Sequence, residues 1–358
     1  MRYRHVRVVV VGAGVNGLCT AWHLASALPG AEIVVIDAHK PGHNLGSSHG
    51  AERIIRTSYE TTGWVEAARR ARNELWPRLE ESLERRLVTP GPAVFWGPED
   101  GPLPAYADAT RDAGARVRQI DPGRARREFP GMTFVDAERV LVDDEAGILA
   151  AADTLDGLRA WLSARGVTLL RGRVHRIDED PTGVLVRSDQ DLVRAQAVVV
   201  AAGPWVTRLY PALLDSLTVV RQDVGYWASD VVAGRSPAWV HLGRQGLHYG
   251  LPTLAGGSMK AAFHRTAAAT QDDPERPREP DNDALGRVRA HLVAWFDPAP
   301  GTLLAADTCI YTNAPQDSFR IYQPSPRIQV VSACSGHAFK LAPLTGEAAA
   351  RWAVGVAG

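Results

Sequence analysis

The 358-residue chain has few cysteines and no excess charge of either sign. Its three cysteines, Cys19, Cys309 and Cys334, are too widely spaced for a disulfide framework or a zinc-binding pattern. This cysteine content predicts a reduced, cytoplasmic protein. Forty basic and forty acidic residues give a formal net charge of zero, which argues against a dedicated nucleic-acid binder.

Long hydrophobic runs are also missing. No stretch of about 18 apolar residues occurs, so we expect no membrane-spanning helix. Residues 1–11 pass from basic residues to valines but run directly into Gly12 without a small-residue cleavage site, and we interpret them as a strand rather than a signal peptide. The composition, 45% hydrophobic and 22% charged, is that of a globular protein, and the length predicts about two domains.

Lysine is rare, since only Lys40, Lys260 and Lys340 stand among the 40 basic residues. A lysine kept in such an arginine-rich chain is a candidate for a role that needs a compact, titratable ammonium group. Chance is the alternative explanation.

A dinucleotide-binding pattern opens the chain. A β-branched run over residues 6–11 leads into Gly-Ala-Gly-Val-Asn-Gly, a helical pattern and a second apolar run that ends in Asp37. Gly12 allows a tight turn, Gly14 lets the backbone approach a pyrophosphate, and Gly17 lets the helix pack on the strand. The helix N-terminus attracts phosphates, and Asp37 is placed to accept hydrogen bonds from a ribose. A glycine-rich turn without a ligand is the alternative.

The remaining pattern alternates helices and strands. We predict helices over residues 64–87, 106–114, 121–130 and 153–165, strands over 88–96, 167–178, 183–187 and 195–200, and a surface loop over 271–283. The strand over 195–200 stops at Gly203, as expected where a backbone must approach another group closely.

Four further clusters could carry chemistry. Arg53 and Arg56 follow a glycine, serine and histidine loop; in a helix or turn they share one face and could clamp a carboxylate. Lys260 and His264 lie four apart in the second of two predicted paired strands, over residues 246–252 and 256–264, and face the same side. Cys309 lies in a β-like stretch, where a buried, unreactive cysteine is the commoner case. Residues 332–340 follow a strand over 328–331 and begin a helix that could face an anionic cofactor.

Taken together, these strings resemble the monomeric sarcosine oxidase and N-methyltryptophan oxidase family of D-amino-acid-oxidase-like flavoenzymes. The matching strings, in chain order, are VVVVGAGVNG, SSHGAERIIR, HYGLP, GGSMK with FH after it, TCIYT and SGHAFK. They span nearly the whole chain. The cysteine and lysine strings are the most specific.

The resemblance implies FAD as cofactor, attached covalently through a thioether at Cys309. The implied cofactor-binding residues are Gly12, Gly14, Gly17, Asp37, Ser47, Ser48, His49, Val174, Gly203, Cys309, Gly336, His337 and Lys340. It also implies that Arg56 and Lys340 grip a substrate carboxylate and that oxygen is reduced beside Lys260. Arg53, Tyr249, His264 and His337 match further active-site positions, with Tyr249 also in contact with substrate, and no metal is needed.

The implied fold is α/β, with a Rossmann-like FAD-binding domain of the glutathione-reductase type and a second, mixed-sheet α+β substrate domain. We place the FAD-binding domain at residues 1–87, 150–215 and 306–358, and the substrate domain at 88–149 and 216–305. The substrate is expected to bind between the two. The partners are a small amino acid and O2, with no nucleic acid or membrane, and the protein is expected to be a monomer.

The implied reaction oxidises the C–N bond of a secondary or cyclic amino acid to an imine and reduces O2 to H2O2. His248 and Tyr249 replace paired aromatics of sarcosine oxidase, and Trp227 and Trp239 lie in segments that line the pocket in relatives. These differences argue against sarcosine itself as the substrate. The strings AERIIR and AFK are also similar to those of a relative that aromatises piperideine carboxylate in antibiotic biosynthesis, which makes a biosynthetic substrate a possibility. A dehydrogenase with another electron acceptor and a non-catalytic dinucleotide-binding protein are the alternatives.

Overall fold

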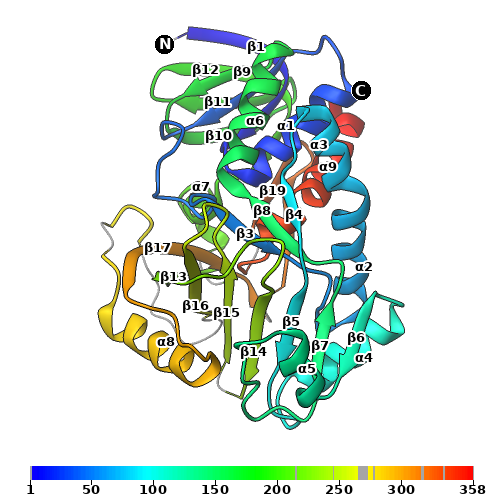
Figure 1. Ribbon diagram of the computed structural model, residues 1–358. Helices are drawn as coiled ribbons and strands as arrows, with labels where there is room; N and C mark the ends of the chain where they lie inside the picture. Colours follow the sequence, from blue (N-terminus) through cyan, green and yellow to red (C-terminus); the bar gives the residue numbers. More distant parts are fainter. Residues whose placement is uncertain are drawn as a thin grey trace.

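Two large mixed sheets and one small sheet organise the molecule in this computed structural model (Figure 1). The structure describes residues 2–213, 216–244, 246–264, 273–276, 279–315, 318–333 and 335–357. The first large sheet lies near both chain ends and the second at the opposite end of the molecule (Figure 1). The predicted α/β class with a second, mixed sheet is confirmed.

The first sheet carries the glycine-rich turn. Its strands, in spatial order, are β10 (Val174–Asp180), β11 (Gly183–Ser188), β12 (Asp191–Val200), β1 (Arg2–Val11), β2 (Ile33–Asp37) and β9 (Thr168–Arg171), with β19 (Ile328–Ala333) beside β12 and β18 (Arg320–Ser325) beside β19. Strands β9, β2, β1, β12 and β19 run parallel. The single strand predicted over 167–178 was wrong, because the chain leaves its parallel partner β2 after Arg171 and begins antiparallel pairing with β11 at Val174.

Helices cover one face of this sheet. They are α1 (Val15–Ala27), α2 (Thr62–Arg70), the π-helix η1 (Ala71–Leu75), α3 (Trp76–Leu83), α6 (Ala151–Ala164) and α9 (Ala338–Ala357). The helix predicted over 64–87 is therefore three consecutive segments. Helices α1 and α9 cross closely, since a Cβ at Gly346 would lie 2.6 Å from the backbone of Cys19. Cys19 is fully buried there and acts as a small core residue.

The second sheet forms the floor of the site described below. Its strands, in spatial order, are β17 (Leu303–Asn313), β13 (Thr218–Ala228), β16 (Ser258–His264), β15 (Gly246–Pro252), β14 (Ala238–Gly243), β5 (Ala93–Trp96), β7 (Val140–Asp143) and β6 (Val117–Ile120). Helices α8 (Asn282–Trp295) and α5 (Pro122–Glu128) share an apolar core with one face of it, while α4 (Leu103–Asp112) packs on the other. The predicted pairing of the strands around Tyr249 and Lys260 is confirmed, because β15 and β16 are antiparallel neighbours.

The surface loop predicted over 271–283 is shorter than expected. Helix α8 already begins at Asn282, because the Asp281 carboxylate accepts hydrogen bonds from the backbone N–H groups of Asp283 and Ala284. Residues 271, 272, 277 and 278 of that loop lie outside the described part of the chain, as does Cys334.

A three-stranded sheet connects the two halves. It consists of β3 (Glu52–Ile55), β8 (Gly147–Ala150) and β4 (Val88–Pro90). Arg53 therefore lies in a strand, and the helix or turn that would have placed Arg53 and Arg56 on one face is wrong. Three short helices follow β12, namely η2 (Gly203–Trp205), α7 (Val206–Leu209) and η3 (Pro211–Leu213). In the described part of the chain, no helix has the length and apolar character needed to span a membrane.

Candidate active site

The glycine-rich turn is as tight as its sequence predicts. Gly12 has a φ of +108°, and a Cβ there would lie 2.3 Å from the carbonyl oxygen of Ala201. A Cβ at Gly17 would lie 1.9 Å from the carbonyl oxygen of Gly12. Both positions therefore require glycine, the first for the turn and the second for the packing of α1 on β1.

A cavity of about 650 Å³ opens in front of this turn. Its lining includes the predicted cofactor residues Gly12, Gly14, Asp37, Ser47, Ser48, His49, Val174 and Gly203. The Asp37 carboxylate accepts hydrogen bonds from the backbone N–H groups of Ala13, at 2.6 Å, and His39, at 2.8 Å. Ser48 Oγ accepts one from Val15 N at the start of α1. Gly17 lines neither this cavity nor the next, consistent with its packing role.

A second cavity, of about 370 Å³, lies against the second sheet. The predicted residues in its lining are Arg53, Arg56, Tyr249, Lys260, His264, Cys309, Gly336, His337 and Lys340. Both cavities share a wall built from Val15, Ala338 and the loop 47–50. The two cavities are therefore adjacent, and together their linings include every predicted site residue except Gly17.

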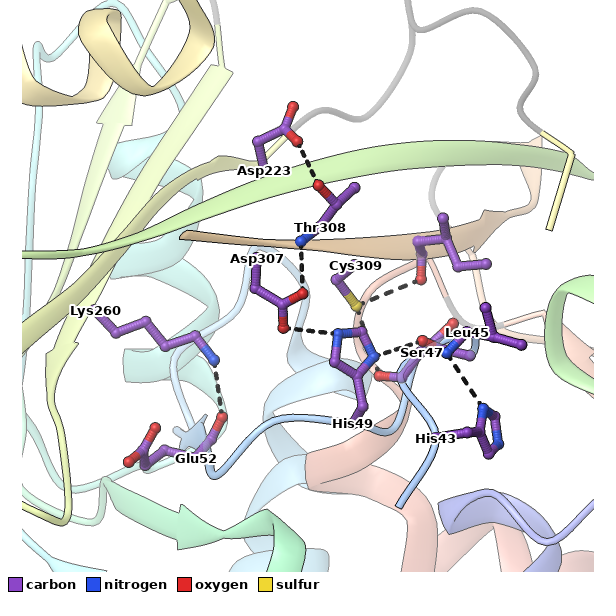
Figure 2. A network of polar contacts seen from close by, with 12 residues as sticks. His43, Leu45, Ser47, His49, Glu52, Asp223, Lys260, Asp307, Thr308 and Cys309 are labelled. Carbon is purple, nitrogen blue, oxygen red and sulfur yellow. Dashed lines mark hydrogen bonds and ion pairs between the residues drawn. The ribbon is translucent and has the colours of Figure 1, made fainter. Parts of the chain in front are cut away.

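Lys260 and Arg53 meet at one backbone carbonyl. Lys260 Nζ donates to the carbonyl oxygen of Glu52 at 3.2 Å (Figure 2). Arg53 Nη1 donates to the same oxygen at 2.8 Å. Lys260 is only 5% exposed. Burial and the nearby Arg53 guanidinium lower the pKa of Lys260 to about 8. A buried ammonium group therefore faces the second cavity at neutral pH, held by a neutral acceptor rather than a carboxylate.

Cys309 lies beside the wall that the cavities share. Its Sγ is 3.7 Å from the carbonyl oxygen of Ser47, and burial raises the pKa of its thiol (Figure 2). Two residues earlier on β17, Asp307 forms an ion pair with His49 Nε2 at 2.9 Å. This contact lowers the pKa of Asp307, and the carbonyl oxygen of Gly46 lies 2.8 Å from the other ring nitrogen of His49. The loop 46–49 is thereby fixed against β17 at Cys309.

Arg56 is held by aromatic rings and by a backbone loop. Its guanidinium lies 4.0 Å from the centre of the Tyr59 ring and donates to the carbonyl oxygen of Ser58. The Asp143 carboxylate, fully buried at the end of β7, accepts hydrogen bonds from the backbone N–H and hydroxyl groups of both Thr57 and Ser58. Asp143 therefore fixes the loop that orients Arg56.

Two uncharged histidines lie close to this arginine, with the His337 ring centre 5.6 Å from that of Tyr59 and 6.0 Å from that of His264. Burial and the Lys340 ammonium lower the pKa of His264 to about 3 and that of His337 well below its ordinary value. Gly336 has a φ of +76°, and a Cβ there would lie 2.6 Å from the Tyr311 ring. Lys340, in the first turn of α9, is 8% exposed, and its carbonyl oxygen accepts a hydrogen bond from the Trp76 indole.

The segments that contain Trp227 and Trp239 line the second cavity, but the two tryptophan side chains do not. Trp227 and Trp239 are 2% and 1% exposed and pack in the core beneath α8. Their sequence neighbours Tyr226 and Val240 line the cavity instead, because successive side chains of a strand point to opposite faces.

Several lining residues were not predicted from the sequence. They are Glu60, Tyr106, Asp307 and Tyr311 in the second cavity, and Arg173, Trp205 and Arg208 in the first. Asp307 and Tyr311 could have been found, since both lie two residues from Cys309 on a strand and so share its face. The others come from segments that only the tertiary fold brings to the site.

Comparison with known proteins agrees with this geometry. The chain matches the family described as FAD dependent oxidoreductase over residues 7–352. It is 28% identical to monomeric sarcosine oxidase of Bacillus sp. (strain B-0618), covering 96% of this chain and 90% of that protein. It is 26% identical to N-methyl-L-tryptophan oxidase of Salmonella enteritidis PT4, covering 97% and 94%.

The chain belongs to the FAD dependent oxidoreductase family. Among solved structures its fold is similar to NikD, an unusual amino acid oxidase essential for nikkomycin biosynthesis, with a TM-score of 0.83, 23% identity and coverage of 98% and 94% of the two chains. It is also similar to L-proline dehydrogenase from P. horikoshii, with a TM-score of 0.83, 18% identity and coverage of 98% and 93%.

The residues present fit an FAD. Gly12 and Gly14 leave the cavity floor without side chains next to the N-terminus of α1, where an anionic pyrophosphate is stabilised. Asp37 would hold the ribose. Because the second cavity adjoins the first, Lys260 and Cys309 lie next to the end of the site where the two cavities meet.

Proposed function

We propose that this flavoprotein oxidises a secondary or cyclic amino acid at its C–N bond. The substrate loses one hydrogen from carbon and one from nitrogen, so that CH–NH becomes C=N, and O2 takes up two electrons and two protons to give H2O2. FAD supplies, when bound, the two-electron acceptor that links these halves. The sarcosine and N-methyltryptophan oxidases among its relatives support this reaction class.

The observation that carries the proposal is the set of buried cations in the second cavity. Arg56 and Lys340 are 5% and 8% exposed, and both line the space that Lys260 and Cys309 also face. Buried guanidinium and ammonium groups bind a carboxylate with charge-assisted hydrogen bonds. We assign to Arg56 and Lys340 the anchoring of the substrate carboxylate.

The same charges favour a neutral substrate amine. A protonated amine beside Arg56, Lys340 and Lys260 would face like charges, which lower its pKa. His264 and His337 stay uncharged at neutral pH, so they add no further cation. Hydride transfer from a neutral amine needs no separate base, and Arg53, Tyr249 and the two histidines then serve to shape and orient the bound substrate.

Lys260 would serve the oxygen half of the reaction. A fixed ammonium group stabilises negative charge that develops on O2 without reorganisation at the moment of transfer. The hydrogen bond to the Glu52 carbonyl holds Nζ in place. With a pKa of about 8, Lys260 is largely protonated at pH 7.

Cys309 would carry the flavin through a thioether, because it lies at the wall shared by the two cavities. We place the FAD-binding domain at residues 1–87, 150–215 and 306–358 and the substrate domain between these segments, with β17 crossing the boundary where it pairs with β13. The similarity to monomeric sarcosine oxidase supports a monomer, and that to NikD supports a biosynthetic substrate. A cytoplasmic location remains the prediction from cysteine content.

The test is an absorbance spectrum before and after acid precipitation, followed by peroxide release from a panel of secondary and cyclic amino acids. Yellow colour retained in the pellet is the expected result for covalent FAD at Cys309. Arg56→Gln and Lys340→Met should each raise KM for an active carboxylate substrate by 10-fold or more, roughly the value of one charge-assisted hydrogen bond. The control Arg118→Gln removes an exposed arginine that pairs with Asp144. Flavin reduction by substrate without peroxide would instead indicate a dehydrogenase with another acceptor.

A further inference from the structure

A short segment with two carboxylates, residues 273–276, lies at the rim of the first cavity. Residues 273–276 belong to the connection between β16 and α8, yet their contacts are with the opposite half of the molecule. Glu275 Oε1 accepts hydrogen bonds from Arg173 Nη1 at 2.8 Å and from Trp205 Nε1 at 2.7 Å. Arg208 Nη1 lies 3.3 Å from the same oxygen.

Asp273 supports this arrangement. Its carboxylate accepts a hydrogen bond from Arg208 Nη2 at 2.8 Å and another from the backbone N–H of Glu275 at 2.9 Å. A backbone hydrogen bond from Arg276 to Asp273 closes the turn. The Arg173 guanidinium lowers the pKa of Glu275, which keeps this carboxylate ionised.

All three residues that Glu275 holds line the dinucleotide cavity. Arg173 lies between β9 and β10, immediately before the predicted cofactor-binding residue Val174, while Trp205 and Arg208 come from η2 and α7. The three side chains come from two separate segments, and Glu275 joins them at one oxygen atom.

Trp205 extends the connection to the predicted ribose site. Its ring centre lies 5.1 Å from that of His39, and the backbone N–H of His39 donates to Asp37. A displaced Trp205 ring would therefore change both one wall of the cavity and the packing beside Asp37.

We propose that Glu275 is a positioning residue for the cofactor, holding Arg173, Trp205 and Arg208 as a closed wall over the dinucleotide and so slowing the dissociation of FAD. The proposal depends on FAD binding and not on the substrate. An argument from charge predicts the opposite effect. Glu275 neutralises two arginines beside an anionic ligand, so its removal would leave these arginines free to attract FAD more strongly. The two arguments predict effects of opposite sign.

The experiment measures FAD release, by the rise of flavin fluorescence on dilution, from holoenzyme that carries Cys309→Ala so that the flavin is not tethered. Glu275→Gln should raise the dissociation rate about tenfold, the size expected for losing hydrogen bonds and ion pairs to one carboxylate. Trp205→Phe keeps the ring but loses the indole donor. The double variant, with Glu275→Gln and Trp205→Phe, should release FAD no faster than the faster single variant, because both substitutions break the same contact between Trp205 and Glu275.

Glu279→Gln is the matched control, an exposed glutamate on the same connection that does not line the cavity. It should leave the dissociation rate unchanged. The FAD concentration that half-saturates the apoprotein, measured in the same Cys309→Ala background, should rise in the same order across the variants. An unchanged or slower release from Glu275→Gln, or additive effects in the double variant, would overturn the proposal.

Discussion

Three histidines where α8 packs on the second sheet give the fold a predictable sensitivity to acid. His241 and His248 face each other across β14 and β15, and His291 of α8 has its ring 4.3 Å from that of His248. Trp295 packs against all three rings. In the described part of the chain, Nδ1 of both strand histidines is buried without a hydrogen-bond partner. Burial lowers the pKa of His241 to about 4 and that of His248 to about 3.

The consequence for stability follows from proton linkage. Below pH 6.5 the unfolded chain binds protons at these positions while the folded protein does not, so the free energy of unfolding falls as pH falls. Between pH 7.5 and 5.5, each of His241 and His248 should cost about 1.4 kcal/mol of stability, or about 3 kcal/mol together. Other buried histidines, such as His23 and His264, add to the total. The informative quantity is therefore the difference between the parent and a variant in the free energy of unfolding that is lost between pH 7.5 and 5.5.

His248→Phe isolates one contribution. Phenylalanine suits a site that already contacts Phe263 and Trp295, and it cannot take up a proton. We expect the loss of stability between pH 7.5 and 5.5 to shrink by about 1.4 kcal/mol relative to the parent, measured by urea unfolding at both pH values. His5→Gln, at an exposed position, is the control for removing an imidazole. Equal losses in parent and His248→Phe would refute the reasoning.

Three other predictions concern the site. Asp143→Asn should raise KM for the substrate about tenfold with a smaller change in kcat in steady-state assays, because it loosens the loop that holds Arg56. An equal rise in KM from Asp143→Asn in the parent and in Arg56→Gln would contradict this reasoning, since Asp143 would then act independently of Arg56. The rate of flavin reoxidation by O2 should fall as pH rises through about 8, where Lys260 loses its proton. Lys260→Met should slow that step about 100-fold or more at pH 7, while the reduction of the flavin by the substrate is much less affected. Stopped-flow absorbance measures both rates. Gly17→Ala should purify without flavin, seen as lost absorbance near 450 nm, because its Cβ would overlap the Gly12 carbonyl; a fully yellow variant would rule this out.

Local patterns in the sequence were sufficient for much of the site. The turn at Gly12 and Gly17 could be predicted because both positions lack space for a side chain, and the close approach lies within one strand–turn–helix unit. Strand periodicity likewise placed Lys260 and His264 on one face, and both line the second cavity. The segments of Trp227 and Trp239 also reach the cavity, but through the neighbouring residues Tyr226 and Val240, because the tryptophans themselves point to the other face of the sheet.

Long-range contacts could not be predicted in this way. Asp143 lies 86 residues from Thr57 along the chain, and its role depends on where β7 ends relative to β3. Glu275 lies 102 residues from Arg173, and nothing in its own polar, proline-rich segment indicates the half of the molecule that it contacts. The roles of such residues depend on which distant segments the fold brings next to them. A single sequence carries no local signal for that proximity.

The register of β17 decides which of its side chains line the second cavity. Asp307, Cys309 and Tyr311 alternate with Thr308 and Ile310, so the first three share the face that lines the second cavity. A slip of one residue would replace Cys309 there with a neighbour that is now buried on the other face. Two contacts oppose such a slip: Ile310 is fully buried, and Thr308 Oγ1 donates to Asp223 on β13 at 2.9 Å (Figure 2). Thr308 therefore helps to fix the position of Cys309 without touching the cavity, because a strand places its functional side chains only as accurately as its buried face fixes its register.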